Sequence, residues 1–390
     1  MKVLHVIPAI APRYGGPSQA VLDMCRGLKT LNIETVIVTT DHDGPGRLRV
    51  PLGELTTYQD VQCYFSSSHC GEGMKLANGL GAWFGAHAKE YAVFHIHSVF
   101  SHASWAASRA AWRHRVPYIV RPLGTLDPWS LRQKPWKKRL AMRVFFRRML
   151  NRAGAIHYTS EGEKRLVEST LGLQRGWVVP LGIAASESEE ADFRAAYTPL
   201  GSHPFVLFLS RLHPKKGIEI LLQAFAEVSC EESLRDWRLV LAGEGDGNYI
   251  ASIRKSITQQ NLNDKVLLCG WISGGEKWAA LREAELLVLP SFQENFGLCV
   301  MESLAMGRPA IISDQVNLWR EVEQARAGWV VELTVSSLSC ALREALNNAS
   351  ERRVRGEAGK RLVDERFRWP LVVRQLKEMY IKVASMNLYA

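Results

Sequence analysis

Two glutamates eight residues apart mark the part of the sequence whose residue types best suit ligand chemistry. Glu294 follows an apolar run that predicts a buried strand, and Glu302 lies in the helix-like run after it, within ELLVLPSFQENFGLCVMESLAMGRPAII. A carboxylate in such a helix can accept hydrogen bonds from both hydroxyls of a ribose. The amides of residues 295–298 would lie at the helix N-terminus, where unpaired N–H groups and the helix dipole favour phosphate or sugar hydroxyls.

A basic loop follows another apolar run, in FVLFLSRLHPKKGIEILLQAF. Arg211, Lys215 and Lys216 lie between the expected strand and a helix that begins near Gly217. A guanidinium and an ammonium at one strand end can neutralise a diphosphate as it becomes a leaving group. A solvated basic turn is the alternative interpretation of this segment.

A pair of glycines, Gly15 and Gly16, follows the first apolar run of the chain and precedes a helical pattern. Glycines at such a point let bare backbone approach a phosphate or sugar beside the positive end of the next helix. A plain tight turn explains the same two residues, so the pair is weak evidence on its own.

The elements that must position these loops alternate along the whole chain. Short β-branched runs such as KVLHVIP, ETVIVTT, FVLFLS and ELLVLP are separated by longer helix-like segments, which predicts βαβ units and parallel sheets. Residues 183–204 are acidic, rich in Ser and Ala and without a strand signal, which is typical of a linker between two domains. Open α/β sheets bind ligands beyond the carboxyl ends of their strands.

The combination of SRLHPKKG and, about eighty residues later, E-x7-E resembles the donor-binding half of family-4 retaining glycosyltransferases with the GT-B fold. The resemblance extends over nearly the whole chain and includes AGEG at 242–245 and LLCGWIS at 267–273. The chain is similar to members that build bacterial polysaccharides. The resemblance implies an α/β fold of two Rossmann-like doubly wound domains facing across a cleft. We expect an acceptor-side domain over 1–185, a donor-binding domain over 200–368, and a C-terminal helix at 369–390 that packs back on the first domain.

The resemblance also implies roles for individual residues. Arg211 and Lys216 would bind the donor diphosphate, and Glu302 would hold the ribose hydroxyls. Glu294 would lie against the transferred sugar. The remaining donor contacts would come mainly from backbone. Sugar hydroxyls and phosphate would meet the backbone of Asn295, Phe296, Gly297 and Leu298. The edge of the base would meet the backbone around Trp271 and Ile272, and Gly15 and Gly16 would close over the phosphate.

The sequence departs from the family at one catalytic position. Many relatives have a histidine at the end of the strand that here reads PYIVRPLG, where this chain has Leu123. Of the histidines in FHIHSVFSHAS, we take His97 as the candidate active-site residue; a packed structural histidine is the alternative. Arg121 and Asp127 are candidates for binding acceptor or sugar hydroxyls, although Asp127 can equally cap a turn before Pro128.

The expected reaction needs neither metal nor cofactor. In such retaining enzymes the departing diphosphate is thought to help deprotonate the acceptor hydroxyl on the same face of the sugar, so the protein mainly positions groups and stabilises charge. Asp41-His42-Asp43 looks like a D-x-D metal motif, but it follows an expected strand, where a turn is the favoured interpretation. We favour UDP-glucose as donor. The alternatives are a GDP-mannose-dependent mannosyltransferase and a nucleic-acid- or nucleotide-binding protein without transferase activity.

Composition bears on partners and location. The net charge of +10 implies an anionic partner, and residues 132–150 combine many cationic side chains with aromatic ones in a helical pattern. This segment fits an anionic membrane surface, or an ordinary basic helix packed on its domain. The seven cysteines include no C-x-x-C pair and no apolar stretch is long enough to span a bilayer. We therefore expect a cytoplasmic protein, peripheral at the inner face of the plasma membrane, with a saccharide or lipid-linked saccharide acceptor and without nucleic acid.

Overall fold

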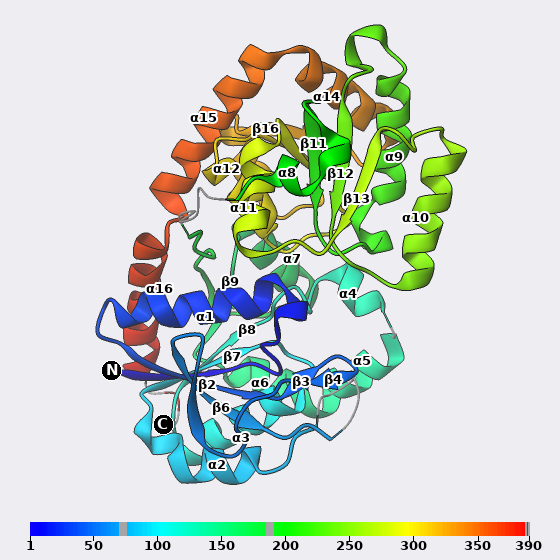
Figure 1. The fold of residues 1–390 in the computed structure, drawn as a ribbon. Coiled ribbons are helices and arrows are strands. Elements are labelled where there is room, and N and C mark those ends of the chain that lie inside the picture. The colour runs from blue at the N-terminus through cyan, green and yellow to red at the C-terminus, as the bar shows by residue number, and fades with distance from the viewer. Residues whose placement is uncertain (70–75, 134, 185–190, 387, 389–390) are drawn as a thin grey trace. The chain divides into compact units, whose positions relative to one another are not determined.

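The chain divides into two compact units, each built on its own sheet (Figure 1). The structure is a computed structural model that describes residues 1–69, 76–133, 135–184, 191–386 and 388. One unit consists of Met1–Gly182 and Trp369–Ala390, and the other of Ile183–Arg368. Within the described residues, no helix is both long and apolar enough to cross a membrane.

The first unit contains an eight-stranded sheet whose neighbours are parallel except for the β5–β6 pair. In spatial order the strands are β10 (Gly176–Val178), β9 (Ala155–Tyr158), β8 (Tyr118–Arg121), β7 (Val93–His97), β1 (Lys2–Val6), β2 (Glu34–Thr40), β6 (Val61–Ser66) and β5 (Leu55–Tyr58). The order reverses between β1 and β7, so the loops after these two strands lie at a topological switch point. A small hairpin pairs β3 (His42–Asp43) with β4 (Gly46–Arg47).

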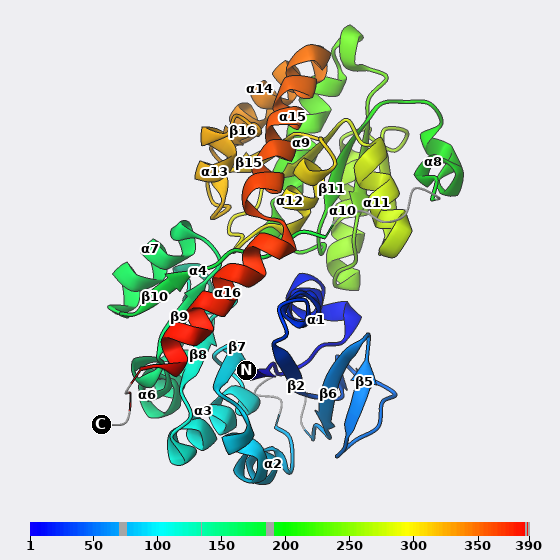
Figure 2. The same cartoon turned by 90° about the vertical axis from the view of Figure 1, so that its left-hand side faces the viewer.

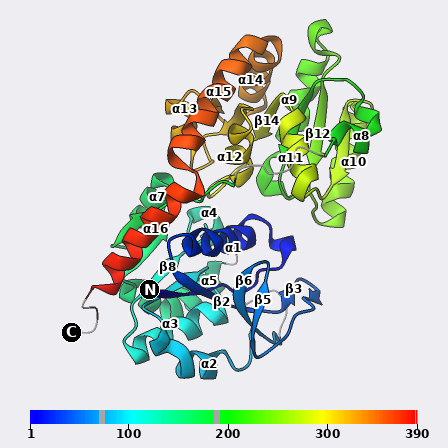
Figure 3. The same cartoon turned by 60° about the vertical axis from the view of Figure 1, so that its left-hand side comes forward.

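Helices cover both faces of this sheet (Figure 3). Because side chains alternate along a strand, Leu4 and Val6 of β1 pack in one cluster and Val3 in another. The Leu4 side carries α2 (Leu80–His87), α3 (His102–His114) and α6 (Arg147–Arg152), and the Val3 side carries α1 (Gly16–Lys29) and α16 (Trp369–Ala384). Figure 2 shows α16 running along β8 and β9. The other helices are η1 (Pro12–Tyr14), η2 (Ala88–Glu90), α4 (Pro128–Arg132), α5 (Pro135–Ala141), the π-helix η3 (Met142–Phe146) and α7 (Glu161–Leu171).

The second unit contains a fully parallel six-stranded sheet. Its spatial order is β13 (Val266–Gly270), β12 (Arg238–Ala242), β11 (Phe205–Leu209), β14 (Leu286–Leu289), β15 (Ala310–Ser313) and β16 (Gly328–Val331). The order reverses between β11 and β14, which places the loops carrying Lys216 and Glu294 at the switch point. Two doubly wound α/β units agree with the predicted fold class.

Two sets of helices accompany the second sheet (Figure 1). Helix α9 (Ile218–Ser229) packs with α10 (Gly247–Gln259) and α14 (Val335–Asn347), whereas α12 (Leu298–Ala305) packs with α11 (Gly274–Glu283) and α15 (Ala349–Arg366). The remaining helices of this unit are α8 (Phe193–Ala196), η4 (Thr198–Leu200), η5 (Pro214–Lys216), η6 (Glu232–Leu234) and α13 (Trp319–Gln324).

The segment predicted to be a linker, 183–204, is largely part of the second unit. Residues 185–190 lie outside the described residues, but Asp192 caps α8 by accepting a hydrogen bond from the amide of Ala195 at 2.9 Å. Phe193 is buried, and its amide donates to Glu283 Oε1 at 3.0 Å. The linker interpretation was therefore wrong for 192–204. A helix of four residues is too short to show a hydrophobic period.

Candidate functional site

An ion pair joins the two loops at the switch point of the second unit. Lys216, in the turn after β11, donates from Nζ to Glu294 Oε2 in the loop after β14. The Lys216 side chain is buried, with 8% exposed, and that of Glu294 is 21% exposed. The amide of Phe292 donates to the carbonyl of Lys215 at 2.8 Å, so backbone also links the loops. The sequence predicted both charged residues as ligand contacts, and the structure brings them together.

The loops come this close because Gly217 has no side chain. Gly217 has φ of 68°, a conformation that favours glycine, and it is the N-cap of α9. A Cβ atom on Gly217 would lie 2.0 Å from the carbonyl oxygen of Pro290, well inside van der Waals contact. Glycine at this position is therefore required by the contact between the two loops.

The electrostatics at this point suit an anionic ligand. Burial would raise the pKa of Glu294, but the charges of Lys216, Lys215 and Arg211 hold that pKa below its usual value. Glu294 is therefore ionised at neutral pH and interacts electrostatically with three cations. Arg211 is exposed and lies two residues after the end of β11. The net charge of these four groups is positive, as a diphosphate site requires.

Glu302 lies in the second turn of α12, where a second ion pair holds it. Lys277 of α11 donates from Nζ to Glu302 Oε1 at 2.7 Å, and both side chains are largely buried. The pair fixes the carboxylate against the helix surface. Lys277 was not predicted from the sequence, because a lysine twenty-five positions before Glu302, on another helix, belongs to no motif.

The N-terminus of α12 presents backbone donors between the two glutamates. Gly297 is its N-cap with φ of 72°, and Leu298 is its first helical residue. The amide of Asn295 donates to Glu294 Oε1 at 3.2 Å. The side chain of Phe296 is buried against Phe367, with ring centroids 6.0 Å apart, so only its backbone is suited to ligand contact. First-turn amides lack a partner within their own helix and favour anions or hydroxyls.

Unpaired polar atoms in the same loop indicate room for polar contacts. Ser291 Oγ and both amide atoms of Gln293 are buried without a hydrogen-bond partner. Buried polar groups are normally satisfied, so such atoms call for a ligand or water. Trp271 and Ile272, the residues predicted to contact the base, directly follow β13, which β12 separates from the central strand β11. Trp271 is 41% exposed and Ile272 is buried.

The predicted glycine loop lies in the first unit. Gly15 has φ of 67° and is the N-cap of α1, and Gly16 begins that helix. A Cβ on Gly15 would meet no atom within 4 Å, so the left-handed conformation, not crowding, favours glycine there. The loop follows β1 at the switch point of its own sheet.

His97 is buried in a histidine cluster and has no exposed surface. Its Nε2 lies 3.0 Å from Nδ1 of His5, and its Nδ1 lies 3.4 Å from NH1 of Arg121. A second chain links His157 Nδ1 to His95 Nε2 at 3.0 Å, and His95 Nδ1 to the hydroxyl of Tyr380 at 2.8 Å. Of the two interpretations of His97, these contacts favour the packed structural one.

Hydrogen bonding sets the protonation pattern of this cluster. Because Arg121 can only donate, His97 Nδ1 accepts, and His97 Nε2–H donates to His5 Nδ1. His157 Nε2 lies 2.8 Å from the carbonyl of Val179 and must donate to it. His5, His95 and His97 place nitrogens within 4.8 Å of one another, as metal ligands could. However, their hydrogen bonds use every ring nitrogen except His5 Nε2, so the described contacts suit neutral histidines without an ion.

The cluster predicts a loss of stability in mild acid. Burial and the charge of Arg121 lower the pKa of His5, and burial foremost lowers that of His157, each to about 3. The unfolded chain therefore binds more protons from about pH 6.5 downward, at a cost of about 1.4 kcal/mol per pH unit for each histidine. We expect the urea midpoint of the first unit to fall markedly between about pH 7.5 and about pH 5.5.

His157→Gln is the matched variant, since glutamine can still donate to Val179 and accept from His95. It should reduce the pH dependence, whereas replacing exposed His69 should not. An equal midpoint at both pH values would show that these histidines titrate normally.

Arg121 and Asp127, on either side of Leu123, have structural partners. Asp127 Oδ1 accepts from the amide of Ser130 at 2.8 Å and caps α4, as the alternative interpretation proposed. Arg121 is buried, and Leu123 has φ of 57°, a strained conformation for leucine. In the D-x-D-like segment, Asp41 pairs with Arg47 at 3.0 Å and accepts from the amide of Ser68 at 2.8 Å. His42 and Asp43 form strand β3, and the turn of this hairpin lies just after them, at residues 44–45.

Two sequence families match consecutive parts of the chain. Residues 15–182 match the family described as Glycosyl transferase 4-like domain, and residues 189–362 match Glycosyl transferases group 1. The chain belongs to the family-4 glycosyltransferases with the GT-B fold. In this glycosyltransferase the two matched families correspond closely to the two units of the structure.

Individual relatives agree with this assignment. The glycosyltransferase is 30% identical over 210 residues to a phosphatidyl-myo-inositol mannosyltransferase of Mycobacterium leprae, covering 53% of this chain and 54% of the relative. It is 25% identical over 346 residues to a GDP-mannose:cellobiosyl-diphosphopolyprenol alpha-mannosyltransferase of Xanthomonas oryzae pv. oryzae, covering 85% and 83%. In several other curated relatives, the matched region spans half of the relative's own length or less.

Solved structures share the fold. The Anabaena protein HepE in complex with UDP and glucose superposes with a TM-score of 0.78 at 18% identity, covering 97% of this chain and 99% of that one. At this identity the likeness shows the fold alone. The GT-B fold predicted from the resemblance is confirmed.

Proposed function

We propose that the chain is a retaining glycosyltransferase that moves a hexose from a nucleotide-sugar donor to a saccharide or lipid-linked saccharide in polysaccharide biosynthesis. The observation that carries the proposal is the pairing of Lys216 with Glu294 at the switch point of the second unit. Arg211 and the N-terminus of α12 emerge at the carboxyl ends of the same two central strands. Cationic groups, backbone donors and a carboxylate together suit a sugar diphosphate.

Each group has a role in the proposed reaction. Arg211 and Lys216 bind the diphosphate and stabilise the charge that grows on it as the glycosidic bond breaks. Glu302, oriented by Lys277, accepts hydrogen bonds from the ribose. Glu294 orients Lys216 and contacts the sugar, and the leaving diphosphate takes the acceptor proton. The proposed reaction needs no metal, because the positive charge comes from side chains and a helix N-terminus.

The donor is proposed to be UDP-glucose. The support is the HepE structure of the same fold, which holds UDP and glucose. GDP-mannose is the second candidate, supported by the GDP-mannose-dependent name of the Xanthomonas relative. That relative's name also contains a diphosphopolyprenol, which supports a lipid-linked acceptor. The proposed location is cytoplasmic and peripheral to the membrane that would hold such an acceptor.

Donor hydrolysis and transfer by metal-stripped protein test the proposal. We expect release of UDP from UDP-glucose in the presence of a chelator, little release of GDP from GDP-mannose, and an α-linked product by proton NMR. Faster use of GDP-mannose would favour the second candidate. A β-linked product would contradict retention, and activity restored only by a divalent cation would contradict a metal-free reaction.

A further inference from the structure

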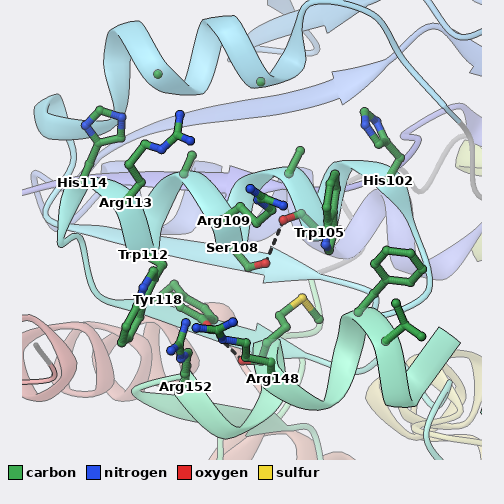
Figure 4. A pocket seen from close by; sticks show the side chains of 17 residues that line it. His102, Trp105, Ser108, Arg109, Trp112, Arg113, His114, Tyr118, Arg148 and Arg152 are labelled. Carbon is green, nitrogen blue, oxygen red and sulfur yellow. Dashed lines mark hydrogen bonds between the residues drawn. The ribbon is translucent and has the colours of Figure 1, made fainter.

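A cavity of about 650 Å³ lies in the first unit and is lined by residues of α2, α3 and α6 (Figure 4). Among the described residues that line this α3 cavity, none has a role in the proposed reaction. Gly81 and Gly85 lie one turn apart on α2, and a Cβ atom on either would meet no atom within 4 Å, so space remains beside both. The volume is typical of sites that bind small ligands.

Four arginines give the α3 cavity its charge. Arg109 and Arg113 line it from α3, and Arg148 and Arg152 point into it from α6 (Figure 4). No acidic residue is among the described residues that line the cavity. In the part of the chain that the structure describes, none of the four arginines forms an ion pair. Burial foremost, and then the charge of Arg148, lower the pKa of Arg152, and a bound anion would offset both effects.

Tryptophan rings orient two of these arginines. The guanidinium of Arg152 lies 3.5 Å from the ring centroid of Trp112, and that of Arg109 lies 5.0 Å from the centroid of Trp105. A guanidinium that stacks on a ring keeps the N–H donors at its edge available for oxygen atoms in its own plane. A carboxylate fits this planar fork with two parallel hydrogen bonds. The arginines are therefore arranged to bind carboxylates.

The tryptophans favour a saccharide over a small anion. Trp105 and Trp112 are seven positions apart on α3, which places them on one side of the helix and about 10 Å apart along its axis. This separation is close to the length of a disaccharide. The C–H faces of sugar rings carry partial positive charge and pack on the negative face of an indole ring. Trp112 is still 37% exposed, although Arg152 stacks on it, so part of its ring is open to a ligand.

We propose that the α3 cavity binds an acidic saccharide, with its sugar rings along the two tryptophans and its carboxylates between the arginines of α3 and α6. The inference goes beyond the proposed function, because the cavity lies along α3 and not among the loops assigned to the reaction. It rests on the glycosyltransferase family of the chain, for which saccharides are the ligands, and not on the donor proposed for the second unit. Such a site would hold a charged saccharide on the enzyme whether or not a donor is bound.

Calorimetric titration of the full chain with tetragalacturonate tests the proposal. Its methyl ester keeps the sugar rings without the charges, and citrate has carboxylates without sugar rings. We expect tetragalacturonate to bind the wild type, and each of the other two compounds to bind at least about tenfold more weakly. Arg109→Ala/Arg148→Ala removes one arginine from each helix and should weaken binding of tetragalacturonate about 100-fold, since one hydrogen-bonded contact between charged groups contributes about tenfold.

The matched control is Arg49→Ala/Arg165→Ala, which removes the same charge from exposed positions in the same unit and should retain most of the binding. Equal losses in both double variants would overturn the site, as would the absence of tetragalacturonate binding by the wild type. Equal affinity for citrate, or binding of duplex DNA in place of tetragalacturonate, would overturn the saccharide as occupant. Unchanged thermal unfolding and UDP affinity would show that the variants are folded and that a lost affinity concerns this cavity, not the donor site.

Discussion

Lys216→Ala is expected to lower kcat/KM for sugar transfer about 100- to 1,000-fold, the largest effect of any single change in this site. The variant removes the buried ammonium that faces the proposed leaving group. It also leaves the Glu294 carboxylate without its ion-pair partner. Loss of the Lys216 charge should raise the pKa of Glu294. While the unpaired carboxylate is ionised, its negative charge opposes binding of an anionic donor. Release of nucleoside diphosphate at saturating and limiting donor, for the variant and the wild type, measures the effect.

Lys215→Ala is the control for this variant, since it removes the same charge from the adjacent position of the same turn. Lys215 is less buried than Lys216, and its charge lowers the pKa of Glu294 less than Lys216 does. We expect a loss of about tenfold or less. Equal losses for the two lysines would mean that general positive charge, and not the Lys216–Glu294 pair, promotes the reaction.

Glu302→Ala is expected to weaken UDP binding about 10- to 100-fold, because a hydrogen bond to a charged acceptor contributes about 1.5–3 kcal/mol. The wild type should also bind 2′-deoxy-UDP more weakly than UDP, and this preference should disappear in the variant. Calorimetric titration of both nucleotides into both proteins forms a complete cycle that isolates the contact. Lys277→Met serves as a control that disturbs the ion pair but keeps the carboxylate.

A preference for UDP over its deoxy form that survives in Glu302→Ala would contradict the ribose assignment. A variant that binds neither nucleotide and unfolds at lower temperature would show that the Glu302–Lys277 pair is needed for packing. Glu302→Gln, which keeps the size of the side chain, would then separate the two roles.

The fold was predictable because its signals are local and repeated. Apolar runs such as FVLFLS and ELLVLP contain the buried strands β11 and β14, and the helix-like runs between them dictate parallel pairing. Parallel order then puts the Lys216 and Glu294 loops at one sheet edge. That these two loops lie close together thus follows from topology. The particular hydrogen bond from Lys216 Nζ to Glu294 Oε2 does not.

Other features depend on packing that a single sequence does not encode in any pattern. Lys277 meets Glu302 only because α11 and α12 are neighbours. His97 shares its strand face with His95, but the sequence does not show that Tyr380 of α16 would cover that face. Period-two alternation places a side chain on a face and leaves open whether helix or solvent lies above it.

A crystal structure of the chain with UDP, and one with GDP, would test the central claim most directly. We expect the diphosphate to lie against Arg211, Lys216 and the N-terminus of α12, with the ribose hydroxyls on Glu302. A nucleotide bound away from the β11–β14 switch point would contradict the proposed donor site.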